Sequence, residues 1–573
     1  MIETTASPRR VRTIRGALAS LLAAWLLLGT HARAAEAASE TIVIPLRDGT
    51  RLLADVFVPG SGRYPVVLEI TPYGRGPEGT SFRGEARYWN AHGYAFVLVD
   101  ARGTGDSGGE FAFFTHAGQD GREVVARLAA QPFSDGRIVM RGASYSGTNQ
   151  LLTAATGAPA LRCLAPAATG GPDPIVDVVY HDGVFQFAWA LDWPTRIAGS
   201  PLPRRSPDWP GLLARGTPEG ADVAALGAPS PLYRAFLEHG PGASFWNPAR
   251  LVGDGLERIS QPALLLAGWY DGTLDGTLEQ FAALQATRPG GHDLHLVVGP
   301  WVHETVANGG RDSRAKDAPM ARVGPRSFPP RAFLEGRELV RRFHDACLDR
   351  GEGLGLPPVR LYLTGSDRWI DLPAWPPAVT TRTLRLRSGG QAGTGQLVSG
   401  PGGGQIELVH DPLDPVPTGV FEVDGRFLHT GLQPVDPTPF LDRAGVHVFT
   451  SAPLPGPLTL LGTVRLELDI ASTAGHADVV AWLAEVDAAG DVITLGARGP
   501  AIARVDTLST APARARLAFS PLGHTVAAGH RLRLYLTSSA WPLTFPLPVS
   551  GTHTVALGGA RPALLELPVY EAP

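Results

Sequence analysis

Cysteine and lysine are nearly absent from this chain of 573 residues, which has two of the first, Cys163 and Cys347, and one of the second, Lys316. Two cysteines are too few for a cysteine-rich zinc site or an iron–sulfur cluster, and they allow at most one disulfide. A P-loop nucleotidase is excluded, because no glycine-lysine pair followed by serine or threonine occurs. Since 50 basic residues face 54 acidic ones, there is no basic excess, and a nucleic-acid partner is not expected.

Long apolar runs are also missing, apart from one near the N-terminus. Arginines at positions 9, 10, 12 and 15 precede the apolar residues 17–29 and the sequence Ala32-Arg33-Ala34. This order is typical of a secretory signal peptide, whereas the alternative, a membrane anchor, needs about 20 apolar residues. We predict a signal peptide over residues 1–34 and a periplasmic or secreted protein that is not held at a membrane. Such a compartment permits a disulfide, but the sequence does not show whether the two cysteines pair.

Apolar strands alternate with helices from about residue 40 to residue 350. Nearly continuous apolar strands separated by helices are typical of a parallel sheet that is covered on both faces. An α/β core is therefore predicted in two parts, residues 40–165 and 261–350, around an aromatic, proline-rich helical insertion at 166–260. The predicted core strands span residues 41–46, 52–58, 64–70, 94–100, 137–141, 161–165, 262–268 and 293–298.

The last part of the chain has a different pattern. From residue 356 to residue 573, short alternating segments such as 383–387, 463–468 and 531–537 are separated by glycine and proline turns. Many short strands without helices predict an all-β sandwich of the jelly-roll type. The predicted fold class is thus an α/β core with a helical insertion, followed by an all-β domain.

The sequence around Ser144 has the pattern of a nucleophile turn. A predicted strand ends at Arg141, and Gly142-Ala143-Ser144-Tyr145-Ser146-Gly147 leads into a predicted helix. A serine at such a bend is exposed beside the N-terminus of the helix, and glycines keep side chains out of the bend. The pattern departs from the commoner Gly-x-Ser-x-Gly, and in a chain with 69 glycines it can also arise by chance.

A serine nucleophile needs a histidine base and an acid that orients it, and in this fold the acid precedes the histidine in the chain. Asp271 follows the strand 262–268, and His303 follows the strand 293–298. Singly, Asp271 could be a turn former and His303 an ordinary loop histidine. Because both lie past the carboxyl ends of strands, where open sheets place their sites, we predict a triad of Ser144, Asp271 and His303.

Two competing motifs are incomplete. The glycines of the segment 103–108 follow a strand as in a dinucleotide-binding loop, but residues 110–114 do not begin a helix. His303-Glu304 begins a zinc-helix motif, but Ala307 stands where the second histidine is needed. Neither a cofactor nor a metal is expected.

These motifs together resemble the cocaine esterase-like serine hydrolases, which group with X-prolyl dipeptidyl-peptidases, α-amino acid ester hydrolases and glutaryl-cephalosporin acylases. The resemblance extends over essentially the whole mature chain. It is carried by Thr71-Pro72-Tyr73-Gly74, by residues 100–109 and 131–133, and by the motifs 142–147, 268–272 and 299–303. It implies an α/β-hydrolase core, a helical cap inserted after the sixth strand, and a jelly roll that closes the site.

The resemblance also implies a role for each site residue. Ser144 would be the nucleophile, His303 the general base and Asp271 its orienting acid. The hydroxyl of Tyr73 and the backbone N–H of Tyr145 would hold the oxyanion. The position of Tyr73 after the strand 64–70 agrees with this, because that loop supplies the second oxyanion donor in this fold.

The residues that select the substrate are less clearly marked. The insertion offers four aromatic residues for an apolar acyl pocket, but their spacing does not form one helical face, so some are expected in the core. Alignment with the family suggests that the jelly roll adds two more residues near the mouth. The candidates are Phe185, Phe187, Trp189, Trp193, Phe427 and Leu428.

Substrates with a free α-amine are not expected. The amino acid ester hydrolases carry two carboxylates, two and three residues after the triad acid, where this chain has Thr273 and Leu274. Asp275 stands one place late, and Asp182 or Asp192 of the insertion could still supply an anionic clamp.

The sequence therefore predicts an exported serine hydrolase that cleaves carboxylic esters through an acyl-enzyme, with amides as a second substrate class. The alternative within this class is an X-prolyl dipeptidyl-peptidase. The alternative outside it is a carbohydrate-binding or structural jelly-roll protein without catalysis. The expected partner is a small-molecule ester or amide, and the oligomeric state is left open.

Overall fold

The computed structural model describes most of the chain from residue 38 to residue 571. The expected signal peptide, Lys316 and Leu428 lie outside the described residues, and for Phe427 only the backbone is described. The described ranges are 38–76, 80–203, 206–251, 253–288, 293–312, 318–391, 393–418, 422–423, 426–427, 434–497, 499–506 and 512–571.

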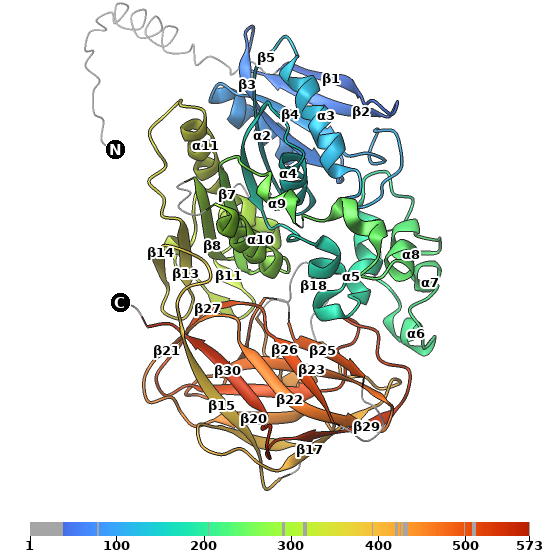
Figure 1. Ribbon diagram of the computed structural model, residues 1–573, viewed down its shortest axis with the longest axis vertical. Coiled ribbons are helices and arrows are strands. Elements are labelled where there is room, and N and C mark those ends of the chain that lie inside the picture. The colour runs from blue at the N-terminus through green and yellow to red at the C-terminus, as the bar shows by residue number, and fades with distance from the viewer. Residues whose placement is uncertain are drawn as a thin grey trace, which may run out of the picture.

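The first part of the chain forms the predicted α/β-hydrolase core around one large sheet (Figure 1). The central strands, from β4 to β13, pair in parallel, whereas β1, β2 and β14 are antiparallel strands at the two edges. Every residue of β4 and β7 is buried, as their continuous apolar sequences predict. In spatial order the strands are β1 (Ala38–Pro45), β2 (Arg51–Val58), β4 (Ala95–Asp100), β3 (Tyr64–Thr71), β5 (Ser134–Ala143), β6 (Leu161–Ala167), β7 (Ala263–Tyr270), β8 (Leu294–Val302), β13 (Val359–Leu363) and β14 (Arg368–Leu372).

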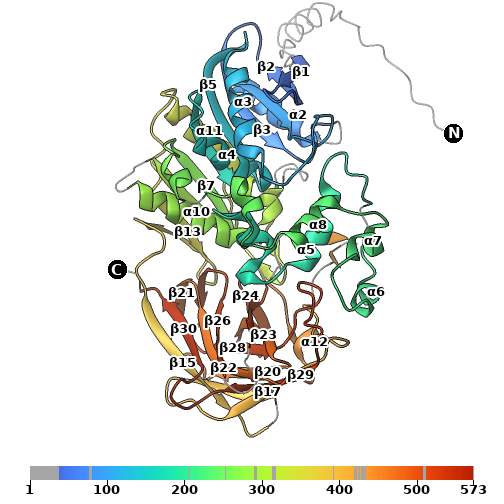
Figure 2. The ribbon, with the colours of Figure 1, turned by 45° about the vertical axis from the view of Figure 1, so that its right-hand side comes forward.

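Helices flank this sheet (Figure 2). In chain order these helices are α2 (Thr80–Ala91), α3 (Ala117–Ala129), α4 (Tyr145–Ala155), α10 (Leu274–Thr287) and α11 (Gly336–Cys347). The helices α3 and α4 pack against each other and against β5, while α2 contacts β4, α10 contacts β7 and α11 contacts β6.

A disulfide joins Cys163 in β6 to Cys347 at the end of α11, which answers the question that the sequence left open. The sulfur of Cys163 is buried, 3.7 Å from Nδ1 of His344, whereas Cys347 is only partly buried. The bond encloses a long loop, since its cysteines are 184 residues apart. It therefore restricts the unfolded chain strongly.

Replacing Cys347 with serine is expected to lower the free energy of unfolding of the core by about 2–4 kcal/mol, because the unfolded chain regains the freedom that the crosslink removes. Cys347 is the better site for the change, since replacing the buried Cys163 would also alter packing. Urea unfolding of the variant and of wild type, with and without dithiothreitol, measures the effect. A wild type whose unfolding is insensitive to dithiothreitol would contradict the prediction.

The predicted helical cap lies between β6 and β7 in the chain and beside the core in space (Figure 2). It also packs on the C-terminal domain, where the ring of Phe187 lies 5.7 Å from that of Trp541 and 5.1 Å from that of Phe545. Its elements are a π-helical turn at Ile175–Val179, α5 (Phe187–Asp192), α6 (Trp209–Ala214), α7 (Ala221–Leu226), α8 (Pro231–Glu238), α9 (Asp254–Glu257) and three short 3₁₀ helices at His181–Gly183, Trp193–Arg196 and Ser244–Ala249.

The C-terminal part is the predicted all-β domain, drawn mainly in orange and red in Figure 1. The first two strands of the segment that was assigned to it, β13 and β14, instead extend the core sheet, with β13 parallel to β8. An alternating sequence suits the edge of either sheet, so only the pairing in the folded chain assigns these two strands. The domain has its own apolar core. The strands that pair in its large sheet are β15 (Thr380–Ser388), β16 (Thr394–Val398), β17 (Gln405–His410), β20 (His447–Ser451), β21 (Leu458–Gly462), β22 (Arg465–Ser472), β23 (His476–Val486), β24 (Val492–Leu495), β25 (Ala501–Asp506), β26 (Ala513–Ala518), β27 (Leu522–Val526), β28 (Arg531–Thr537), β29 (Gly551–Ala556) and β30 (Leu564–Val569). Among the described residues, the short strands β18 (Glu422–Val423) and β19 (Arg426–Phe427) pair only with each other.

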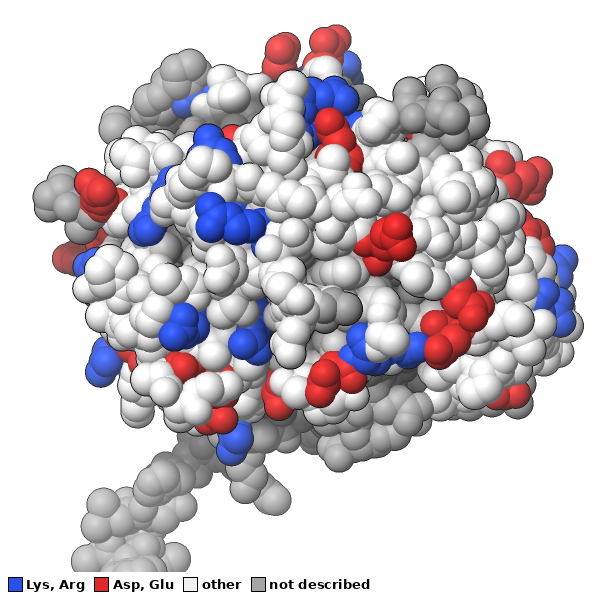
Figure 3. Space-filling view, turned by 90° about the horizontal axis from the view of Figure 1, so that it is seen from below, with Lys and Arg blue, Asp and Glu red and all other residues white. Residues whose placement is uncertain are grey.

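The surface of the β-rich end carries charges of both signs. Seen from below, basic and acidic side chains are scattered among uncharged ones (Figure 3). Within the described residues, no helix has the length and apolar character needed to cross a membrane.

Candidate active site

Ser144 stands at a strained turn between β5 and α4. Its backbone has φ 61° and ψ −122°, a conformation that is costly for a residue with a side chain. The two glycines of the motif are required by close contacts: a Cβ on Gly142 would lie 2.5 Å from Cβ of Ser146, and one on Gly147 would lie 2.5 Å from the carbonyl oxygen of Ala167. The strand, the bend and the helix that the sequence predicts are therefore all present around Ser144.

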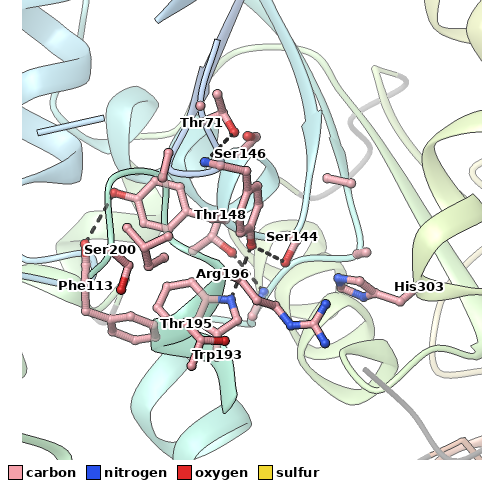
Figure 4. A pocket seen from close by; sticks show the side chains of 18 of the residues that line it. Thr71, Phe113, Ser144, Ser146, Thr148, Trp193, Thr195, Arg196, Ser200 and His303 are labelled. Carbon is pink, nitrogen blue, oxygen red and sulfur yellow. Dashed lines mark hydrogen bonds between the residues drawn. The ribbon is translucent and has the colours of Figure 1, made fainter. Parts of the chain in front are cut away.

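Asp271 and His303 meet at the carboxyl ends of two neighbouring strands. Asp271 follows β7 and His303 follows β8, and their Oδ1 and Nδ1 atoms are 2.7 Å apart. Asp271 is fully buried, and its Oδ1 also accepts hydrogen bonds from the backbone N–H (2.8 Å) and hydroxyl (3.0 Å) of Thr273. Ser144 and His303 line the same cavity of about 1190 Å³, and Figure 4 shows the ring of His303 turned toward Ser144.

The surroundings of His303 favour its protonated form. Burial alone would lower the pKa of His303, but the charge of Asp271 and its hydrogen bond outweigh burial, so the pKa lies above the ordinary value of 6.5. Glu304 adds to this effect, while the guanidinium of Arg196, which reaches alongside the ring in Figure 4, opposes it. The pair can therefore accept a proton and hold the resulting imidazolium.

Tyr73 also reaches Ser144. Its hydroxyl lies 3.5 Å from Oγ of Ser144 and accepts a hydrogen bond from Nε1 of Trp193 at 3.3 Å. Because the indole can only donate, the phenol proton remains available to Ser144 or to an oxyanion. Burial of the hydroxyl raises the pKa of Tyr73, so the phenol stays protonated and can donate at neutral pH.

The backbone N–H of Tyr145 lies in the first turn of α4, where N–H groups have no acceptor within the helix. The position of the residue is well defined, because its ring stacks on Phe114 at a centroid distance of 4.5 Å and its hydroxyl donates to the carbonyl of Phe113 at 3.3 Å. The N–H of Tyr145 and the hydroxyl of Tyr73 thus flank Ser144 as two donors.

The cavity contains only part of the predicted acyl pocket. Trp189 and Trp193 line it, and their rings stack at 5.4 Å with an interplanar angle of 16°. Sequence reasoning missed the other apolar residues of this wall, since nothing local marks them. The larger of them are Phe82 in α2, Phe113 and Phe114 after β4, Val178, Ile197 and Leu202 in the cap, and Leu543 from the β-rich domain.

Phe185 and Phe187 do not line the cavity, contrary to prediction. The ring of Phe185 packs against Tyr180 and Tyr233 inside the cap, and the fully buried Phe187 packs against the β-rich domain. The physical reason is the turn of α5, which directs Phe187 away from the side that carries Trp189 and Trp193. The prediction for Leu428 falls outside the described residues, and for Phe427 no side chain is described.

None of the three candidate carboxylates for an amine clamp lines the cavity. Asp192 pairs with Arg196 at 2.7 Å, and Asp182 lies 3.5 Å from Nε2 of His181. Oδ2 of Asp275 accepts a hydrogen bond from Ser520 at 3.1 Å and also lies 3.7 Å from His181. These carboxylates therefore hold parts of the fold together.

Glu69 is a charged residue of the cavity that sequence reasoning missed. It lies on β3 next to the nucleophile turn, since a Cβ on Gly142 would be 3.4 Å from its side chain. Burial raises the pKa of Glu69 to about 7, Arg141 at 3.6 Å opposes this rise, and the neighbouring Glu85 adds to it. Glu69 is thus a second group that changes charge near neutral pH.

Comparison with known proteins agrees with this geometry. The family model described as X-Pro dipeptidyl-peptidase (S15 family) matches residues 48–305. The model for the X-Pro dipeptidyl-peptidase C-terminal non-catalytic domain matches residues 354–565. The chain therefore contains an S15 peptidase domain followed by the C-terminal domain that accompanies it, and it is a serine hydrolase. The family resemblance inferred from the motifs is thereby confirmed, and the non-catalytic alternative is set aside.

Individual relatives cover most of the chain. Cocaine esterase of Rhodococcus sp. (strain MB1 Bresler) is 29% identical over 493 residues, which are 80% of this chain and 82% of that protein. Two solved structures share the fold: an aminopeptidase from the marine sediment archaeon Thaumarchaeota archaeon has a TM-score of 0.80 at 22% identity, covering 94% of this chain and 97% of its own. An α-amino acid ester hydrolase has a TM-score of 0.79 at 23% identity, covering 93% of this chain and 97% of its own. The similarity in fold to both structures thus extends over the α/β core and the β-rich domain.

Proposed function

We propose that this S15-family chain is an exported esterase in which Ser144 attacks the ester carbonyl. His303 takes the proton of the Ser144 hydroxyl as the bond to the carbonyl carbon forms, and Asp271 stabilises the imidazolium. The oxyanion accepts hydrogen bonds from the Tyr73 hydroxyl and the Tyr145 N–H. His303 then gives its proton to the departing alcohol, and water, activated by the same histidine, releases the acid from the acyl-enzyme.

One observation carries the proposal: the hydrogen-bonded pair of His303 and Asp271 shares a cavity with the strained Ser144, whose Oγ lies 3.5 Å from a phenol donor. The most direct test is labelling with a fluorophosphonate probe, which reacts with activated serines. Peptide mapping is expected to find the adduct on Ser144. An adduct on another residue, or none, would contradict the proposal.

Export is supported by the N-terminal sequence alone. We expect the protein, expressed in its native host, to be recovered from the periplasm or the medium. N-terminal sequencing is expected to show cleavage after Ala34 or after Ala37. Recovery of the uncleaved chain from the cell interior would contradict this part of the proposal.

Esters are expected to be hydrolysed faster than dipeptide anilides. A protonated substrate amine near Thr273 would lack the two carboxylates that the amino acid ester hydrolases carry after the triad acid. An unpaired buried charge costs several kcal/mol, and each 1.4 kcal/mol is about tenfold. The stacked rings of Trp189 and Trp193 favour an apolar acyl group instead. We expect kcat/KM for a phenyl or butyryl ester to exceed that for an Ala-Pro anilide by at least about a hundredfold.

The control for this comparison is the N-acetylated anilide, which lacks the charge. If the free-amine anilide is strongly preferred over the acetylated one, an anionic clamp exists, and the dipeptidyl-peptidase alternative replaces the esterase.

The pH dependence of kcat/KM is expected to show an acid limb with its midpoint above 6.5. His303 must be neutral to accept a proton, and Asp271 holds the pKa of His303 above that value, so activity falls as the pH drops through the raised pKa. Glu69 could add a second step near pH 7. Glu69→Gln is the control, because it removes that step and is expected to leave the His303 limb in place. A limb below pH 6 in both proteins would contradict the assignment.

A further inference from the structure

The triad acid lies in a short segment, residues 269–275, that contacts the β-rich domain at both ends. Trp269 precedes Asp271 by two residues and packs against β27, while Asp275 follows it and accepts a hydrogen bond from Ser520. The same stretch of the β-rich domain, residues 520–524, makes both contacts.

The first contact is a tight one between a glycine and an indole ring. A Cβ on Gly523 would lie 2.3 Å from Cζ2 of Trp269, so the ring lies directly on the backbone of β27. The other side of the indole is fixed, because its Nε1 donates to the carbonyl of Tyr362 in β13 at 2.6 Å. Backbone hydrogen bonds of 2.9 Å and 2.8 Å join Thr364, at the end of β13, to Gly523 and Thr525. The strand β27 is thereby attached to the sheet that carries the triad.

The second contact joins three parts of the protein. Oδ2 of Asp275, in the first turn of α10, lies 3.1 Å from the hydroxyl of Ser520 in the β-rich domain and 3.7 Å from Nε2 of His181 in the cap. Asp275 therefore fixes the start of α10, directly after the loop of the triad acid.

The segment 520–524 is itself held from behind. Nε2 of the buried His524 is hydrogen-bonded to the carboxylate of Glu485 at 3.0 Å, and Nδ1 of His530 is hydrogen-bonded to the same carboxylate at 2.7 Å. Arg326, from a hairpin of the core, reaches Glu485 at 3.1 Å. A displacement of this segment would break the hydrogen bonds of the buried His524 to Glu485 and, at 2.8 Å, to Thr364, so the segment forms a rigid support.

Asp271 depends on such support. Its Oδ2 has no hydrogen-bond partner among the described residues, and its Oδ1 is bonded only to Thr273 and His303. The position of the Asp271 carboxylate therefore depends mainly on the backbone of residues 269–275. We propose that residues 520–524 of the β-rich domain are a positioning element that holds Asp271 in register with His303. This inference rests on the proposed function, and it gives a domain described as non-catalytic a part in the reaction.

The test is Gly523→Ala, which places a methyl group where Trp269 lies. A displacement of about 1 Å at a catalytic group can cost about a hundredfold, so we expect kcat on a p-nitrophenyl ester to fall by about 10- to 100-fold with KM little changed. Loss of the Asp271 hydrogen bond lowers the pKa of His303, so the acid limb of kcat/KM is expected to move to lower pH. A merely destabilising change would not move that limb.

Gly456→Ala is the matched control, because it adds the same methyl group in the same domain, where no atom lies within 4 Å. It is expected to keep the wild-type kcat and pH profile. Ser520→Ala tests the other contact and stays informative if Gly523→Ala does not fold. It is expected to move kcat and the acid limb in the same direction by a smaller factor.

Fluorophosphonate labelling of wild type at Ser144 distinguishes failure of the proposed function from failure of the positioning inference. If wild type is not labelled there, the proposed function fails. If wild type is labelled and active but the folded variants keep its kcat and acid limb, the positioning inference is wrong. It is also wrong if the variants lose activity and melting temperature together while the acid limb stays in place.

Discussion

Replacing Ser144 with alanine is expected to lower kcat by about six orders of magnitude, because the members of a triad act as one unit and the nucleophile has no substitute. The change removes one oxygen at the tip of the turn between β5 and α4. The geometry of His303 and Asp271, which are bonded to each other at 2.7 Å, is expected to remain. Steady-state hydrolysis of a p-nitrophenyl ester, together with fluorophosphonate labelling, measures the effect.

Ser146→Ala is the matched control, since Ser146 belongs to the same turn and lines the same cavity. Labelling of Ser144 is expected to persist in this variant. A Ser144→Ala protein that retains a tenth of the wild-type activity would show that another residue is the nucleophile.

Replacing Tyr73 with phenylalanine is expected to lower kcat by about a hundred- to a thousandfold, with KM little changed. The change removes a hydroxyl that lies 3.5 Å from Oγ of Ser144 and leaves the ring in place. The oxyanion would then be held by the Tyr145 N–H alone. The hydroxyl stabilises the reaction mainly once negative charge develops on the carbonyl oxygen. Its removal is therefore expected to lower kcat rather than to raise KM.

Tyr180→Phe is the matched control for this variant. The hydroxyl of Tyr180 donates a hydrogen bond to the carbonyl of Phe236 at 2.7 Å within the cap, and Tyr180 does not line the cavity. Its removal is expected to change kcat by less than a factor of a few. If Tyr73→Phe behaves in the same way, the oxyanion is held by other groups.

The candidate triad could be picked out from the sequence because each of its residues lies at a point where local pattern and fold agree. A run of apolar residues marks each strand, and the residue that follows a parallel strand must lie at one edge of the sheet. Asp271 and His303 follow neighbouring strands, so their contact follows from the strand order of this fold. Tyr73 follows β3, which pairs in parallel with the strand before Ser144, and the same reasoning applies to it.

The substrate pocket could not be predicted in this way. The four aromatic residues of the cap look alike in sequence, but Trp189 and Trp193 line the cavity, whereas Phe185 and Phe187 pack inside the cap and against the β-rich domain. A short helix offers apolar residues on several sides, and only its neighbours decide which side faces the cavity. Leu543 reaches the cavity from a domain whose docking no local pattern describes.

The sequence by itself determined the fold class, the family and the candidate triad of Ser144, Asp271 and His303, because strand ends and tight glycine turns are local properties. Only the tertiary structure decided that Cys163 and Cys347 pair, that β13 and β14 belong to the core sheet, and that Asp275 joins three parts of the protein. The physical reason is the same in each case. These contacts bring together residues that are far apart in the chain, and their partners are set by how the core, the cap and the β-rich domain pack against one another.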